Sequence, residues 1–157
     1  MAIELDKVDV RLLQELQQDA SRPNVELARI VGLSPAATLN RVRRLKESGV
    51  VRTISARLDS GAAGFPLQVY VSVTLTRHDD AGHRRFAGAL AAMPEVIAAD
   101  WVTGETDAML MVVAHDVAQL QRVLSLLSTK GGASRVVTLL RLEELKPASP
   151  LPLVATR

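Results

Sequence analysis

A short glycine-centred turn between two amphipathic segments constrains the fold of this 157-residue chain more than any other feature. Gly32 can take the positive φ that ends one helix, the Ser34 hydroxyl can cap the next, and Pro35 suits its first position because no N–H is needed there. Two short helices joined in this way form a helix-turn-helix, which can place its second helix in the major groove of DNA. The turn therefore predicts paired helices over residues 24–46 and makes DNA binding the first hypothesis to weigh.

Apolar residues at steps of three and four predict three helices in residues 1–50. The expected inward stripes are Leu5, Val8, Leu12 and Leu16 in the first helix, Leu27, Ala28 and Val31 in the second, and Leu39, Val42 and Leu45 in the third. We expect Asn24 to cap the second helix and Gly49 to close the third. Residues 1–50 are thus predicted to form a helix-turn-helix domain with a thin core that would gain from outside support.

The remaining pattern predicts a linker and an α+β domain. A β-branched run followed by small, flexible residues indicates an extended linker strand and hinge over 51–64. The expected order over 65–146 is β-α-β-β-α-β, a ferredoxin-like arrangement, and residues 147–157 are expected to form a flexible tail. The strands are predicted at 68–76, 96–102, 108–114 and 136–145, and the helices at the N-caps Asp79 or Asp80 and Asp116.

Composition narrows the chemistry available to the chain. There is no cysteine, which excludes disulfides, thiolate zinc sites and a cysteine nucleophile. The N-terminus is charged where a signal peptide needs an apolar core, and no apolar run approaches the length of a membrane span. We therefore expect a cytoplasmic protein without a metal or cofactor.

Positive charge is concentrated around the third predicted helix. The net charge is only +2, yet the segment from Arg41 to Arg57 holds six basic residues and one acidic residue. A local basic patch of this kind is typical of a surface that contacts phosphates, although a solvated helix face has the same composition. Together with the helix-turn-helix, the patch favours double-stranded DNA as the partner.

A helical wheel separates the residues that would read bases from those that would contact the backbone. The residues nearly opposite the expected apolar stripe are Ala37, Asn40 and Arg44, and Ala36 and Arg41 flank this outward-facing group. Thr38 falls toward the core. Asn can pair with adenine and Arg with guanine, whereas Arg43, Lys46, Arg52 and Arg57 are better suited to phosphates. The predicted DNA-binding residues are Ser34, Ala36, Ala37, Asn40, Arg41, Arg43, Arg44 and Lys46.

Other classes of function fit the sequence less well. Asp100, Glu105 and Asp107 could serve acid–base or metal chemistry, but a hairpin with solvated carboxylates is the simpler interpretation. The three histidines show no metal-ligand spacing, and the second half lacks the basic-aromatic run of an RNA-recognition module. A stand-alone amino-acid-binding module would leave the basic helix unexplained. We therefore expect no enzymatic activity.

The chain resembles the Lrp/AsnC family, the leucine-responsive and feast/famine regulators, over nearly its whole length. The segments that carry the resemblance are L-D-K-V-D at 5–9, L-L-Q-E-L-Q-Q-D-A at 12–20, V-G-L-S-P at 31–35, R-V-R-R-L at 41–45, M-P-E-V at 93–96, V-T-G-E-T-D at 102–107 and L-E-E-L-K at 142–146. The resemblance implies a sequence-specific transcriptional regulator. It also implies a dimer that assembles further, often into an octamer, and an amino-acid effector bound between dimers.

The resemblance places the effector site near the 103–107 turn. The implied effector-binding residues are Gly104, Glu105, Thr106, Asp107 and Thr138. An exposed backbone at Gly104 suits an α-carboxylate, and Asp107 suits an ammonium group or an ordering role in the loop. The chain has Thr106 where the family usually has an aromatic residue and Val136 where a threonine is common, so an effector-independent regulator remains the alternative.

Overall fold

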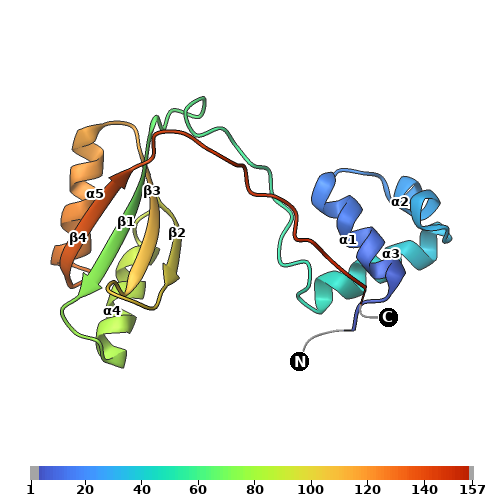
Figure 1. The fold of residues 1–157 in the computed structure, drawn as a ribbon, viewed down its shortest axis with the longest axis horizontal. Coiled ribbons are helices and arrows are strands. Elements are labelled where there is room, and N and C mark those ends of the chain that lie inside the picture. Colours follow the sequence, from blue (N-terminus) through green and yellow to red (C-terminus); the bar gives the residue numbers. More distant parts are fainter. Residues whose placement is uncertain (1–3, 156–157) are drawn as a thin grey trace. The chain divides into compact units, whose positions relative to one another are not determined.

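The computed structural model describes residues 4–155 and divides them into two units (Figure 1). The first unit contains the described residues up to Ala56 together with those from Lys146 onward, and the second runs from Arg57 to Leu145. The chain therefore passes between the units twice.

Three helices build the first unit: α1 (Lys7–Gln18), α2 (Asn24–Val31) and α3 (Pro35–Glu47). Their shared core is small. Its buried members are Leu12, Leu13, Leu27 and Leu45, with partly buried apolar side chains from all three helices around them. The predicted three-helix unit is confirmed.

The turn between α2 and α3 has the predicted chemistry, but the start of α2 does not. Gly32 has φ 70° and ends α2, and Ser34 Oγ accepts the Ala37 N–H at 3.2 Å to cap α3. The predicted Asn24 cap is wrong: Pro23 is the N-cap residue and provides no side-chain cap. Asn24 instead donates from Nδ2 to the Pro35 carbonyl at 2.8 Å, which ties the start of α2 to the start of α3.

The second unit has the predicted β-α-β-β-α-β order. Its elements are β1 (Leu67–Leu75), α4 (Asp80–Ala91), β2 (Val96–Trp101), β3 (Ala108–Ala114), α5 (Val117–Thr129) and β4 (Ala133–Leu140). All strand pairs are antiparallel, and the sheet order is β2-β3-β1-β4. Asp79 and Asp116 cap α4 and α5 as expected. The last strand begins and ends earlier than predicted, and Leu142 and Leu145, which lie beyond its end, are 89% and 91% exposed.

The sheet has one covered face and one open face. Alternate residues of β1, from Val69 to Leu75, are buried with Phe86 of α4 and Leu127 of α5, so both helices pack on the same side (Figure 1). On the other side, Tyr70 stands opposite Met111 and Leu139 in the cross-strand register. Tyr70 and Leu139 are 38% and 52% exposed. The unit therefore presents an apolar sheet surface that its own helices leave uncovered.

The linker and the described part of the tail, residues 147–155, contain no helix or strand. Residues 52–59 pair with no strand among the described residues, so the predicted linker strand is here an unpaired segment, followed by a turn at residues 60–64. In the tail, Gln17 of α1 donates to the Leu151 carbonyl and accepts the Leu151 N–H at 2.7 Å. Leu153 packs on the core of the first unit. The tail thus supplies the outside support that the thin helical core was expected to need.

Candidate nucleic-acid interface

The outward face of α3 is rotated relative to the sequence prediction. Thr38 is fully buried and its Oγ1 donates to the Ser34 carbonyl at 3.0 Å, which confirms its predicted structural role. The predicted inward position of Leu39 is wrong, because 47% of this side chain is exposed. Thr38 takes its place in the buried stripe with Val42 and Leu45. The solvent face is therefore centred nearer to Arg43 than to Arg44.

Most of the predicted DNA-binding residues lie on or beside this face. The exposed ones are Ser34, Ala36, Asn40, Arg43, Arg44 and Lys46, whereas Ala37 and Arg41 are half-buried. Within the described part of the chain, neither Arg43 nor Lys46 takes part in an ion pair or a side-chain hydrogen bond. These two cations are therefore available for an external anion.

Arg41 and Arg44 are engaged with the first helix instead. Asp6 and Asp9 form a capping box at the start of α1, and Asp9 is only 1% exposed. Arg41 donates from Nη1 to Asp6 Oδ2 at 2.6 Å and to Asp9 Oδ1 at 3.0 Å, and Arg44 donates from Nη2 to Asp9 Oδ2 at 2.5 Å. Two carboxylates of α1 thus hold two guanidinium groups of α3. We call these four residues the α1–α3 clamp.

The contacts of the clamp shift the pKa values of Asp6 and Arg41. The Asp9 N–H and the Arg41 guanidinium lower the pKa of Asp6 below its ordinary value. The hydrogen bond from Arg41 to Asp6, followed by that to Asp9, raises the pKa of Arg41. Both shifts favour the charged forms. The contact between Asp6 and Arg41 therefore stabilises the charged form of both groups.

The clamp was missed by sequence reasoning, although a signal for it exists. Asp6 and Asp9 are three residues apart on one helix, and Arg41 and Arg44 are three residues apart on another. Side chains at this spacing share a helix face. Matching acidic and basic pairs on neighbouring helices could have suggested the contact, whereas the wheel of α3 alone could not.

In the second unit, the 102–107 turn is tied to the end of β1. Thr106 Oγ1 donates to the Val73 carbonyl at 2.8 Å, and Asp107 Oδ2 accepts the Leu75 N–H at 2.7 Å. Asp107 Oδ1 lies 3.2 Å from His78 Nδ1. Of the predicted effector residues on this turn, Thr106 and Asp107 thus serve the fold, while Gly104 and Glu105 are exposed.

Thr138 lies on a different strand from that turn. It is an exposed residue of β4, at one edge of the sheet, where it pairs with Val71. The turn joins β2 and β3, but its Thr106 side chain hydrogen-bonds to Val73 of β1, the strand next to β4. The strand that holds the turn and the strand of Thr138 are therefore neighbours, about 4.8 Å apart.

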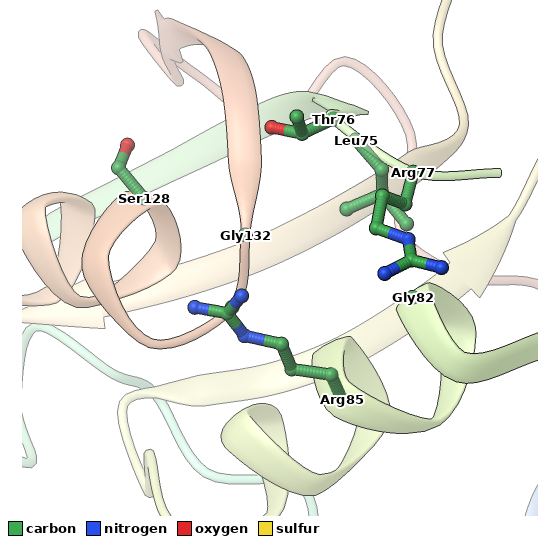
Figure 2. Close-up of a pocket in the computed structure, with 8 residues that line it drawn as sticks. Leu75, Thr76, Arg77, Gly82, Arg85, Ser128 and Gly132 are labelled. Atoms are coloured by element: carbon green, nitrogen blue, oxygen red, sulfur yellow. The ribbon is translucent and has the colours of Figure 1, made fainter. Parts of the chain in front are cut away.

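The second unit also contains two cavities away from the predicted effector residues. One, of about 220 Å³, lies between the start of α4 and the end of α5, and Figure 2 shows Arg77 and Arg85 at its border. Arg85 donates to the Lys130 and Thr129 carbonyls, and Arg77 pairs with Asp79. The other, of about 180 Å³, is lined mainly by apolar side chains of α4 and β2. Neither lining includes a residue of the 103–107 turn or Thr138.

The acidic and histidine side chains weighed for catalysis are not assembled into a site. No group of three or more potential metal ligands occurs within residues 4–155. His83 lies against the Trp101 ring, and His115 contacts the Gly64 carbonyl and stacks on Phe65. These contacts give His83 and His115 packing roles, while His78 contacts Asp107 of the turn.

Comparison with known proteins decides the family. Residues 5–46 match the AsnC-type helix-turn-helix domain, and residues 68–151 match the Lrp/AsnC ligand binding domain. The chain belongs to the Lrp/AsnC family. Its relatives include the leucine-responsive regulatory protein of Rhizobium meliloti, 39% identical over 93% of this chain and 94% of that protein. The HTH-type transcriptional regulator AldR of Mycolicibacterium smegmatis is 36% identical over 96% of this chain and 88% of that protein.

Solved structures of this family share the fold over nearly the whole chain. A transcriptional regulator from Neisseria meningitidis, in complex with L-Met, aligns with a TM-score of 0.86 at 33% identity and covers 94% of this chain and 96% of that one. An AsnC family regulator from Agrobacterium tumefaciens aligns with a TM-score of 0.84 at 28% identity, over 94% and 97%. The present chain is accordingly an HTH-type transcriptional regulator of the Lrp/AsnC family, as its two named relatives are regulators. In the part that the structure describes, no helix has the length and apolar character to cross a membrane.

Proposed function

We propose that this regulator binds double-stranded DNA through the outward face of α3, with Ser34, Ala36, Ala37, Asn40, Arg43 and Lys46 at the interface. The observation that carries this proposal is the pair of cations Arg43 and Lys46, which form no ion pair or side-chain hydrogen bond with any residue that the structure describes, on the second helix of the helix-turn-helix. The small side chains at the start of α3 permit close approach to base edges, and Asn40 has the chemistry to read adenine.

The DNA proposal is tested by selection of duplexes from a randomised library, followed by affinity measurements at several salt concentrations. We expect Lys46→Ala to weaken binding to all duplexes alike and to reduce the salt slope by about one, because a phosphate contact is lost. Glu47→Ala, which changes a charge on the same helix without removing a cation, is the matched control. Enrichment of no duplex by the unaltered protein would contradict the proposal.

We also propose that the chain works as a dimer formed through the open sheet face, with further assembly such as an octamer. Tyr70 and Leu139 give this face a partly exposed apolar surface, continued by Met109 and Met111 of β3. Contiguous apolar surface of this kind is typical of a protein interface. A dimer would supply two recognition helices, which short half-sites require for specificity.

Analytical ultracentrifugation tests the dimer. Leu139→Glu places a charge in the proposed interface and is expected to shift the protein toward the monomer. Leu142→Glu is the matched control, since this leucine is 89% exposed and belongs to no strand. Equal sedimentation of both variants and the unaltered protein would exclude this face.

We further propose that an amino acid or a related metabolite binds between chains, with Gly104, Glu105, Thr106, Asp107 and Thr138 as the effector-binding residues. Gly104, Glu105 and Thr138 are exposed, so they are accessible both to a ligand and to a second chain. The relative from Neisseria meningitidis is a complex with L-Met, so methionine belongs among the first ligands to test. Gly104 and Glu105 would meet the ligand directly, and Asp107 would hold the turn.

A thermal-shift screen of amino acids tests the effector. A ligand at about one hundred times its Kd adds about 2.7 kcal/mol to the stability of the unit that binds it. Thr138→Val should remove the shift without lowering the melting temperature of the free protein, because this residue is exposed. The second candidate, an effector-independent regulator, is favoured by the internal hydrogen bonds of Thr106 and Asp107 and would show no shift with any amino acid.

A further inference from the structure

The strongest unassigned feature of the molecule is the buried carboxylate of Asp9. It lies at the start of α1, and its two oxygens accept hydrogen bonds from Arg41 and Arg44 of the DNA-binding helix. A carboxylate that is 1% exposed needs cationic or hydrogen-bonding partners, since an unpaired charge in that position is strongly destabilising. Arg41 and Arg44 therefore both serve to keep the Asp9 carboxylate paired in the folded protein.

The geometry of the clamp fixes the direction of α3 as well as its attachment. Arg41 bridges both carboxylates, and Arg44, one turn further along α3, reaches Asp9 alone. Two donors one turn apart on α3 are thus held by two acceptors one turn apart on α1. Sliding or rotation of α3 against α1 breaks at least one of these pairs.

We propose that Arg41 and Arg44 are positioning residues that orient the recognition helix through Asp6 and Asp9, and that Arg43, with Asn40, determines base specificity. This inference rests on the proposed DNA binding by α3 and assigns different roles to its arginines. Leu39, the exposed apolar side chain beside Arg43, completes the reading surface as a contact for a thymine methyl group.

The charges on α3 are consistent with a positioning role for Arg41 and Arg44 and a base-reading role for Arg43. Arg43 and Lys46 form no ion pair with a described residue, and Glu47 is the acidic residue of α3. Arg41 is bonded to two carboxylates and the Nη2 of Arg44 to one. A guanidinium that leaves Asp9 for a phosphate removes one of the two cationic partners of a buried carboxylate, whereas Arg43 has no such contact to break.

The experiment compares three single variants on the duplex that the unaltered protein enriches most, and on every single-base substitution of it. Arg43→Ala should leave the melting temperature unchanged and lose about ten- to one hundredfold discrimination at one base pair. Arg44→Ala, studied at a temperature at which circular dichroism shows it folded, should bind all duplexes several-fold more weakly with the same order of preference. Its salt slope should be unchanged, and Arg44→Lys should restore much of the affinity because a cation again faces Asp9.

The outcomes separate this inference from the proposed function. If the unaltered protein enriches no duplex, DNA binding by α3 fails. If it enriches a duplex but Arg43→Ala keeps the full base preference, the specificity role of Arg43 is overturned. A changed base preference in Arg44→Ala, or a salt slope reduced by about one, would show a direct DNA contact and overturn the positioning role.

Asp6→Asn provides a second route if Arg44→Ala does not fold. Asp6 is half-exposed, so its neutralisation loosens Arg41 while the Asp9 pairs remain. We expect a uniform, smaller loss of affinity for every duplex, with Arg41→Lys behaving in the same way. A rise in affinity for Asp6→Asn would show instead that the carboxylate withholds Arg41 from DNA, and would overturn the positioning role of Arg41.

Discussion

The two units of this chain reach stability by different means. The buried apolar cluster of the first unit has four members among the described residues, whereas that of the second has twelve, joined by a four-stranded sheet. The first unit adds to its small core the ion pairs of the buried Asp9 carboxylate and contacts from the C-terminal tail. A small DNA-binding unit of this kind uses charged side chains for its own fold, which leaves fewer of them for DNA.

The largest expected effect on stability comes from replacing one buried leucine by alanine in the core of each unit. Leu12→Ala in α1 and Leu110→Ala in β3 each remove a leucine that is at most 1% exposed, so each should cost about 2–5 kcal/mol of its unit's stability. Because the first unit has the smaller core, Leu12→Ala should unfold it while the second unit stays folded. Hydrogen exchange measured separately over the two units checks this.

Leu142→Ala is the control for both, since this leucine is 89% exposed and the same atoms are removed. Loss of protection in both units after Leu12→Ala would contradict the independence of the two folds. Such a result would mean that the difference in core size does not decide which unit unfolds first.

The next effect concerns the tail. Leu153→Ala should destabilise the first unit by about 1–2 kcal/mol, because a partly buried side chain leaves the small core. Val154→Ala is the neighbouring control, with a side chain that is 82% exposed. Thermal unfolding followed in the first unit should separate the two variants. A shared small effect would show that the tail adds nothing to the helical core.

A smaller effect is expected from the helix cap that was visible in the sequence. Ser34→Ala removes the acceptor of the Ala37 N–H at the start of α3 and should cost about 1 kcal/mol. Ser34→Asp keeps an acceptor and should restore the stability, while its negative charge should weaken DNA binding. Chemical denaturation of the two variants measures the difference. Equal stability of Ser34→Ala and the unaltered protein would contradict the capping role.

What the sequence predicts well is local chemistry. The alternation of β1, the caps Asp79 and Asp116 and the positive φ of Gly32 depend on neighbours in the chain, and all are present in the structure. The DNA-facing residues of α3 are harder: the wheel places Thr38 toward the core, as observed, but it also places Leu39 there, and 47% of this side chain is exposed. A hydropathy pattern predicts that Leu39, rather than the more polar Thr38, is the buried side chain.

Tertiary contacts account for the remaining differences. Arg41 lies 35 residues from Asp6, and Asp107 lies 32 residues from Leu75, so each pair is formed only after the helices or strands have packed. In both places a polar side chain suited to an external ligand is bound by the protein itself. Residue type and local spacing identify where such groups gather, while the packing of the elements decides which remain available.

The smallest expected effect is a difference in acid sensitivity between the units. The Asp9 N–H, followed by Arg41, lowers the pKa of Asp6 below its ordinary value of 3.8, and the Gly82 N–H, followed by Arg77, does the same for Asp79. A carboxyl group with a lowered pKa in the folded state contributes stability above its ordinary pKa and loses it as the pH falls through the folded value. Both units should therefore weaken below about pH 4.

The first unit should weaken more, because Asp6 joins α1 to α3 whereas Asp79 caps only its own helix. Unfolding of each unit followed from about pH 5 to about pH 3 measures the two slopes. Asp6→Asn should reduce the pH dependence of the first unit's stability and leave that of the second unit unchanged. Asp79→Asn should reduce the pH dependence of the second unit's stability and leave that of the first unit unchanged. Equal slopes in the unaltered protein would mean that the contact between helices adds no acid sensitivity beyond that of an ordinary cap.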